Sequence, residues 1–200
     1  MQSCTVLLNK PIGCVTARRD ATHRTVLDCL PSSLASLHPI GRLDRDTEGL
    51  LLLTDDGRLT AHLTHPSHHV PKTYAFWAIG ELSEEALQRL RTGLLLPPDP
   101  TPTLPAAATV TDHSTLYRIT EQIPPAYRSQ LLKNRDLPVT AGTLTICEGR
   151  THQVRRMLRA VGCSVICLRR IALGSLTLGD LPSGAWRELT QEEIAALWNE

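Results

Sequence analysis

The chain has 200 residues, 42% of them hydrophobic, which is enough to bury a core and argues against disorder. With 21 Lys and Arg against 20 Asp and Glu, the net charge of +1 does not by itself indicate a nucleic-acid partner. The aromatic content of 4% argues against a general single-strand binder, which needs several stacking platforms. No run reaches membrane-spanning length, and the cysteines have no zinc-type spacing. We expect a cytoplasmic protein with reduced thiols.

The first half of the chain predicts alternating strands and short helices. Each expected helix follows a capping residue: Thr25 precedes a helix over 26–30, Asp56 precedes one carrying Leu59 and Leu63, and Ser83 precedes one that ends at Gly93. Buried strands are expected at residues 5–8 and 50–53 and further strands at 14–17 and 72–79, with a turn over residues 10–13 between the first two in the chain.

A proline-rich stretch divides the chain. Five prolines fall between Pro97 and Pro105, which excludes regular structure and predicts a connection between lobes of about 1–96 and 106–200 within a single catalytic domain, 1–200. After it, we expect a hairpin over 108–112 and 116–121 and then a loop over 123–138. Further strands are expected at 143–147, 164–168 and 171–178. One helix is expected from about residue 153 to Gly162, and a last helix begins after a capping box at Thr190. Without βαβ regularity, the pattern favours an α+β fold with a largely antiparallel sheet.

Positive charge is concentrated late in the chain. No acidic residue lies between Gly149 and Gly179. The same window holds six arginines: Arg150, Arg155, Arg156, Arg159, Arg169 and Arg170. Such a cluster predicts an electrostatic footprint for nucleic acid, although a solvated helix face balanced by distant acids would give the same pattern.

One carboxylate stands out. Asp44 lies between Arg42 and Arg45, just ahead of the apolar run 50–53, so it is expected at the edge of a core, where a nearby cation keeps it ionised. Taken alone, such a carboxylate is more often a structural ion-pair member than a catalyst. In the same way, Tyr74 alone indicates a half-buried strand aromatic and Arg155 a solvated helix residue.

Three separated motifs together resemble a known family. They are Gly-Arg-Leu-Asp at 41–44 with Asp-Thr-Glu-Gly-Leu at 46–50, Val-Pro-Lys-Thr-Tyr at 70–74, and Glu-Gly-Arg-Thr-His-Gln-Val-Arg-Arg-Met at 148–157. With Leu-Asn-Lys-Pro-x-Gly at 8–13 and Arg-Arg-Ile-x-x-Gly at 169–174, they resemble the pseudouridine synthases of the small-subunit ribosomal RNA type, over about residues 7–194. The resemblance implies the pseudouridine synthase fold, a mixed sheet in two lobes with flanking helices and a central active-site cleft. It also implies isomerisation of a flipped-out uridine in RNA, without a metal or organic cofactor.

The resemblance also assigns roles. Asp44 matches the essential carboxylate, acting as a nucleophile or as a base; Tyr74 matches the aromatic that stacks on the target base; Arg155 matches the basic partner of the aspartate. Arg42 would hold the flipped nucleotide or fill the vacated stack. Lys10, Arg150 and His152 have weaker claims as contacts to RNA or as turn structure.

The chain begins almost at the first catalytic strand, so we expect it to lack the N-terminal RNA-binding module that many relatives carry. RNA binding would then fall on the catalytic domain's own basic surface. The expected surface comprises Arg156, Arg159, Arg169, Arg170 and the loop over 123–138.

Alternatives remain open at this point. Ribosomal RNA is the favoured substrate, transfer RNA is another, and a ribosome-assembly factor that binds RNA without altering it would need the arginines but not Asp44. A metal hydrolase using His62, His65, His68 and His69 is disfavoured, because Pro66 prevents these histidines from sharing one helix face. We expect a monomer with no membrane partner.

Overall fold

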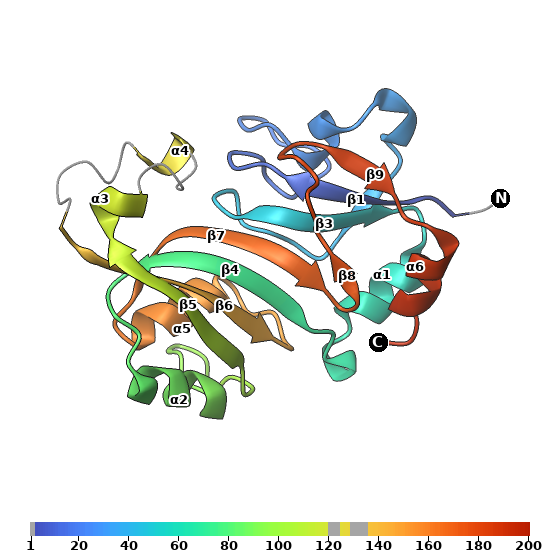
Figure 1. Cartoon of the computed structure of the whole chain (residues 1–200). Coiled ribbons are helices and arrows are strands. Elements are labelled where there is room, and N and C mark those ends of the chain that lie inside the picture. Colours follow the sequence, from blue (N-terminus) through green and yellow to red (C-terminus); the bar gives the residue numbers. More distant parts are fainter. Residues whose placement is uncertain (1–2, 120–124, 129–135) are drawn as a thin grey trace. The chain divides into compact units, whose positions relative to one another are not determined.

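The computed structural model describes residues 3–119, 125–128 and 136–200 (Figure 1). The chain forms two compact units. The first comprises Met1–Lys72 with Arg169–Glu200, and the second comprises Thr73–Leu168. This division differs from the expected lobes, because the chain leaves the first unit after Lys72 and returns at Arg169, while the proline-rich stretch lies inside the second unit.

The first unit is built on a mixed sheet. Its central strands, β1 (Thr5–Lys10) and β3 (Glu48–Thr54), pair antiparallel, with Lys10 opposite Gly49. Strand β9 (Trp186–Glu188) pairs with β1, and β2 (His38–Ile40) pairs with β3, both antiparallel. The end of β7 (Ser164–Leu173) runs parallel to β3, and β8 (Leu176–Thr177) folds back on β7.

Two helices cover the core of the first unit. Helices α1 (Gly57–Thr64) and α6 (Gln191–Leu197) lie side by side (Figure 1), with the rings of His62 and Trp198 5.0 Å apart. Alternate β3 residues point towards them. The buried cluster includes Leu7, Ile40, Leu50, Leu52, Leu59, Leu63, Val70, Leu173, Leu176, Leu178, Leu189 and Leu197. Single 3-10 turns occupy Val26–Cys29, Ser32–Leu34 and Pro66–His68.

The second unit has strands in the order β5-β6-β4-β7. Strands β5 (Ala107–Thr115) and β6 (Pro138–Ile146) pair antiparallel, with an irregularity between Val110 and Asp112. Strand β4 (Lys72–Ile79) lies next to β6. Its helices are α2 (Glu84–Thr92), α5 (Gln153–Ala160) and the short α3 (Leu116–Ile119) and α4 (Pro125–Arg128).

The α+β class and the largely antiparallel sheet are confirmed, as are the helices capped by Asp56, Ser83 and Thr190, whereas the helix expected over 26–30 is instead a 3-10 turn, Val26–Cys29. The side chains of Asp56, Ser83 and Thr190 accept hydrogen bonds from the first turns of α1, α2 and α6. No described helix is long and apolar enough to cross a membrane. None of the six cysteines, all in the described ranges, forms a disulfide.

Three expected elements are wrong. Residues 14–17 form no strand but a single bridge, from Val15 to Thr25. The expected hairpin over 108–121 is instead one strand, β5, that pairs with β6 and is followed directly by helix α3; residues 120 and 121 lie outside the described ranges. Strand β7 continues through Arg169 and Arg170, where a break was expected. The expected loop over 123–138 contains α4, and most of its other residues lie outside the described part of the chain.

Candidate active site

Asp44 opens a tight turn just before β3. The amide of Thr47 donates to the carbonyl oxygen of Asp44 at 3.1 Å, and the two residues between them, Arg45 and Asp46, are exposed while Asp44 is half-buried. A turn closed by this bond fixes the backbone direction at its first residue. Arg45 and Asp46 therefore form the outer part of the turn, and Asp44 lies at its inner end.

The Asp44 turn is tied to the segment after β1. The amide of Gly13 donates to the carbonyl oxygen of Arg45 at 2.8 Å. The hydroxyl of Thr16 donates to the carbonyl oxygen of Leu43 at 2.6 Å, and the amide of Leu43 lies 3.2 Å from the same hydroxyl oxygen. Bonds from a distant segment reach both sides of Asp44, so its position is set by tertiary structure as well as by the turn.

Lys10 holds the same turn from the inside. Its side chain is fully buried, and Nζ donates to the carbonyl oxygen of Thr47 at 2.8 Å, with longer contacts to those of Pro11 (3.2 Å) and Arg45 (3.5 Å). Burial lowers the pKa of Lys10 to about 8, while nearby acidic groups, Asp46 and Asp44 among them, oppose this shift. Its burial and its bonds to backbone carbonyls do not favour the expected RNA contact by Lys10, which stays a prediction.

The buried Lys10 predicts a specific pH dependence of stability. Its pKa is about 8 in the folded chain against an ordinary value near 10.5, so the unfolded state binds more protons between these values and stability rises with pH across this interval. From pH 7 to 9.5, the free energy of unfolding of the wild type should increase by about 2 kcal/mol relative to that of Lys10→Met. Urea unfolding of both proteins at each pH measures this difference; parallel curves for the two proteins would contradict it.

Two arginines of β7 lie opposite the first residues of β3. Glu48 is paired with Arg169 and Gly49 with Arg170. Arg170 is 3% exposed and its Nε donates to the carbonyl oxygen of Leu50 at 2.7 Å. Arg170 therefore supports β3, and its burial does not favour the expected role as a surface RNA contact, which stays a prediction. Burial raises the pKa of Glu48, against the opposing charges of Arg169 and Lys10.

Other predicted residues of the first unit remain accessible. Arg42 is exposed and follows Gly41, whose φ of 68° is a conformation that favours glycine. Arg169 is half-buried. Of the basic residues expected in this unit, these two are open enough to meet a phosphate.

Tyr74 lies in the second unit, near the start of β4. It is 8% exposed and shares one face of the strand with the buried Phe76 and Ala78. On the other face, the hydroxyl of Thr73 is 2.8 Å from that of Thr145 on β6, a hydrogen bond that ties the two strands together. The ring of Tyr74 is thus held by a paired strand rather than a loop.

Arg155 lies in the first turns of α5. Val154, Met157 and Leu158 are buried, whereas Arg155 is half-buried and Arg159 is exposed. The residue before the helix, His152, is exposed and has a φ of 51°, an uncommon conformation for a residue with a side chain. The helical spacing predicted from the apolar residues is confirmed, and Arg155 lies at the edge of the buried face.

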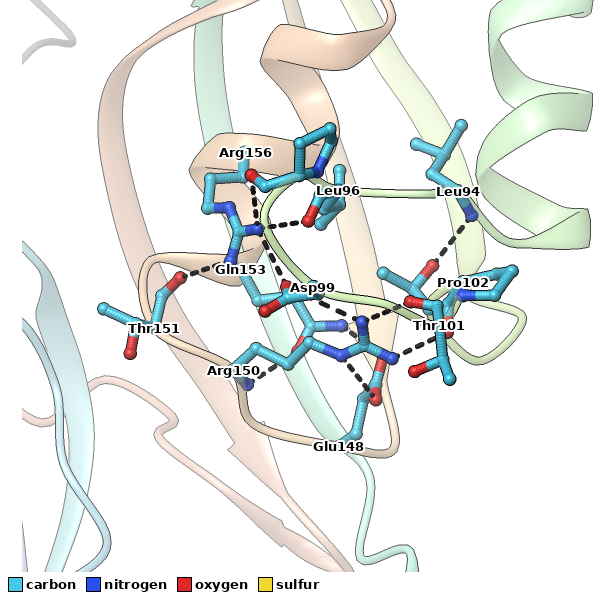
Figure 2. A network of polar contacts seen from close by, with 12 residues as sticks. Leu94, Leu96, Asp99, Thr101, Pro102, Glu148, Arg150, Thr151, Gln153 and Arg156 are labelled. Carbon is cyan, nitrogen blue, oxygen red and sulfur yellow. Dashed lines mark hydrogen bonds and ion pairs between the residues drawn. The ribbon is translucent and has the colours of Figure 1, made fainter.

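Arg150 and Arg156 have a different role from the expected one. Arg150 donates through Nη1 to the carbonyl oxygen of Thr101 (2.7 Å), through Nη2 to that of Pro102 (2.6 Å) and through Nε to Glu148 (3.1 Å) (Figure 2). Arg156 Nη2 donates to the carbonyl oxygen of Leu96 at 2.6 Å. These guanidinium groups bind the proline-rich stretch, so the expectation that they contact RNA is not supported by their geometry.

Three partners in this network are not predicted from the sequence: Asp99, Glu148 and Gln153. Glu148 and Gln153 flank Arg150 within a quoted motif, and their spacing could have suggested a closed polar turn. Asp99 lies in the proline-rich stretch, where no local pattern connects it with a helix more than 50 residues later.

The rings of the histidine segment lie close to one another. In the described part of the chain, no group of three or more His, Cys, Asp or Glu side chains could hold a metal ion. The ring of His68 lies 4.5 Å from that of His62 and 5.3 Å from that of His65, and its Nδ1 is 2.8 Å from the carbonyl oxygen of His62. Helix α1 ends before Pro66, as expected.

Solved structures of known proteins are similar to this chain. A crystal structure of a pseudouridylate synthase matches with a TM-score of 0.80 and 36% sequence identity, covering 98% of this chain and 74% of the other. The human RNA pseudouridylate synthase domain containing 1, at 18% identity and a TM-score of 0.60, shares the fold.

Sequence relatives agree as well. The ribosomal small subunit pseudouridine synthase A of Escherichia coli is 38% identical over 193 residues, 96% of this chain and 72% of the relative. The ribosomal large subunit pseudouridine synthase E of Vibrio parahaemolyticus is 39% identical over 186 residues, 92% of this chain and 73% of the relative. The family model for RNA pseudouridylate synthase matches residues 5–160. The chain therefore belongs to the RNA pseudouridylate synthase family.

Proposed function

We propose that this chain isomerises a specific uridine of ribosomal RNA to pseudouridine, with Asp44 as the essential carboxylate. The observation that carries the proposal is the anchored turn at Asp44, which Gly13, Thr16 and Lys10 hold from a distant segment. A reacting group needs such a fixed position, because small displacements cost large factors in rate. Relatives named for ribosomal RNA of either subunit, at 38% and 39% identity, support the choice of substrate.

The reaction balances without a cofactor. The bond between N1 of uracil and C1′ of ribose breaks, the base turns, a bond forms between C5 and C1′, C5 loses its proton, and N1 gains one. In the proposal, Asp44 attacks the nucleotide or removes a sugar proton, Tyr74 stacks on the base, and Arg155 pairs with Asp44. The chain acts as a cytoplasmic monomer on a nucleotide flipped out of its helix.

RNA binding in this proposal rests on the accessible basic residues. Arg42, His152 and Arg159 are exposed and Arg169 is half-buried, whereas Lys10 and Arg170 are buried and Arg150 and Arg156 are bound within the chain. The surface is therefore smaller than the count of arginines suggests.

Two matched substitutions separate surface from structural arginines. Arg159→Gln should reduce the slope of log Kd against log salt by about 0.7, as expected for one phosphate contact to single-stranded RNA. Arg150→Gln should leave that slope unchanged and lower the thermal stability, because it removes bonds to Thr101, Pro102 and Glu148. Binding titrations at several salt concentrations test this pair, and the reverse pattern would refute it.

The function itself is tested by incubating the wild-type protein with unmodified small-subunit ribosomal RNA, large-subunit ribosomal RNA and transfer RNA. New pseudouridines are mapped at nucleotide resolution in each. A single modified site in one ribosomal RNA is the expected result. Modification of transfer RNA alone would overturn the substrate, and binding without modification would favour the assembly-factor alternative.

A further inference from the structure

Asp99 is the shared acceptor of two arginines that flank Arg155 in the sequence. Its Oδ2 accepts a hydrogen bond from Arg156 Nη2 at 2.8 Å and lies 3.6 Å from Arg150 Nη1 (Figure 2). The three side chains are 20–29% exposed, so these ion pairs are partly shielded from water and more effective than surface pairs. One carboxylate thus joins the turn before α5 to the first turn of the helix.

The same arginines fasten the backbone around Asp99. Arg156 Nη2 donates to the carbonyl oxygens of Leu96 (2.6 Å) and Pro97 (3.1 Å), and Arg150 donates to those of Thr101 and Pro102. The stretch of chain before and after Asp99 is therefore bound on both sides. A proline-rich backbone loses few further degrees of freedom when it is bound in this way, which makes it a stiff support for the helix.

The turn that leads into α5 is closed by a second set of bonds. Gln153, which is 3% exposed, accepts from the amide of Arg150 at 2.9 Å and donates to Glu148 at 2.7 Å. Glu148 also accepts from the amide of Leu104 at 3.0 Å. Both ends of the turn from Glu148 to Gln153 are thus held by hydrogen bonds. Asp99 adds a bond to Arg156, the residue after Arg155.

We infer that Asp99 is a positioning residue for Arg155. The contacts of Arg150 and Arg156 with Asp99 set the angle and depth at which the start of α5 is held, and Arg155 lies between them in the sequence. The inference rests on the proposed function, in which Arg155 pairs with the catalytic carboxylate. Asp99 acts through the helix and does not touch the nucleotide.

The test compares steady-state kinetics of Asp99→Asn with those of the wild type on the RNA that the wild type modifies. The substituted amide keeps the shape of the carboxylate and loses its charge, so we expect kcat to fall about tenfold to a hundredfold, with KM changed by less than about twofold because RNA contacts are untouched. Asp99→Glu should restore part of kcat. Glu84→Gln, which removes an exposed ion pair with Arg91 in the same unit, should leave both constants unchanged.

A double-substitution cycle identifies the route of the effect. If Asp99 acts through Arg155, adding Asp99→Asn to Arg155→Lys should lower kcat by less than about twofold further, since coupled residues are not additive. The inference would be overturned if the effects of Asp99→Asn and Arg155→Lys on kcat were fully additive, or if Asp99→Asn left kcat unchanged. It would also be overturned if the fall in kcat of Asp99→Asn only matched the fall in its folded fraction at the assay temperature. Failure of the proposed function looks different, because the wild type itself would then form no pseudouridine.

Discussion

If Asp44 is the catalytic carboxylate, Asp44→Asn should nearly abolish pseudouridine formation, with a single-turnover rate lower by about a thousandfold, while the protein stays folded. The amide keeps the size of the carboxylate but can neither attack a sugar carbon nor accept a proton, and a positioned acid or base contributes about 10²–10⁴-fold in rate. The backbone bonds that hold the turn, from Gly13 and Thr47, do not involve this side chain. Single-turnover assays with a pseudouridine-containing product as the readout measure the effect.

Asp46→Asn is the matched control. It lies two residues further in the same turn, is exposed, and acts on the Lys10 charge as Asp44 does. It should retain kcat within about twofold, since surface substitutions away from the reacting atoms have small effects. Equal activity of Asp44→Asn and the wild type would refute the catalytic assignment, whereas equal loss in both variants would show that the charge of the turn matters rather than one carboxylate.

The elements predicted correctly are those whose signals are local. Asp56, Ser83 and Thr190 cap their helices as expected, because a cap and its helix lie within a few residues of each other. Strand β4 has the predicted bounds, Lys72–Ile79, since its alternating buried residues give a clear period of two.

The elements predicted wrongly depend on distant partners. Strand β5 pairs with β6, whose residues follow more than 20 positions later, so the expected local hairpin has no partner to form it. Residues 14–17 alternate like a strand but lie against the Asp44 turn, where Thr16 bonds to Leu43 instead of to a neighbouring strand. Sequence periodicity does not contain this information.

The candidate site shows the same limit. The motifs name Asp44, Tyr74 and Arg155 as catalytic residues. The resemblance suggests Lys10, and the charge pattern suggests Arg170, as contacts to RNA, although both are buried. A positive residue can bind a phosphate or a buried carbonyl, and the sequence does not distinguish the two until the fold shows which one is within reach. Their burial also means that fewer basic groups reach the surface than the charge pattern of the sequence suggests.

Gly49→Ala should destabilise the first unit strongly. Gly49 has a φ of 110°, and a Cβ at this position would overlap the carbonyl oxygen of Arg170 and lie 2.7 Å from its amide nitrogen. Both atoms belong to the backbone of a paired strand, so no side-chain rotation relieves the overlap. Backbone strain and overpacking together cost about 3–5 kcal/mol, which is a large part of the stability of a typical domain.

The matched control is Gly57→Ala, at the first residue of α1. No atom lies within 4 Å of a Cβ built there, and Gly57 has no positive φ, so alanine should be neutral or slightly stabilising through its helix propensity. Thermal unfolding should place Gly49→Ala roughly 10 °C or more below the wild type and Gly57→Ala at or above it. Equal midpoints of thermal unfolding for the two variants would mean that the backbone of Arg170 on β7 lies less close to Gly49 on β3 than the structure shows. A lower unfolding midpoint for Gly49→Ala alone would show instead that the parallel pairing of β3 with β7 requires a residue without a side chain at this position. The Asp44 turn, which leads directly into β3, depends on the same pairing.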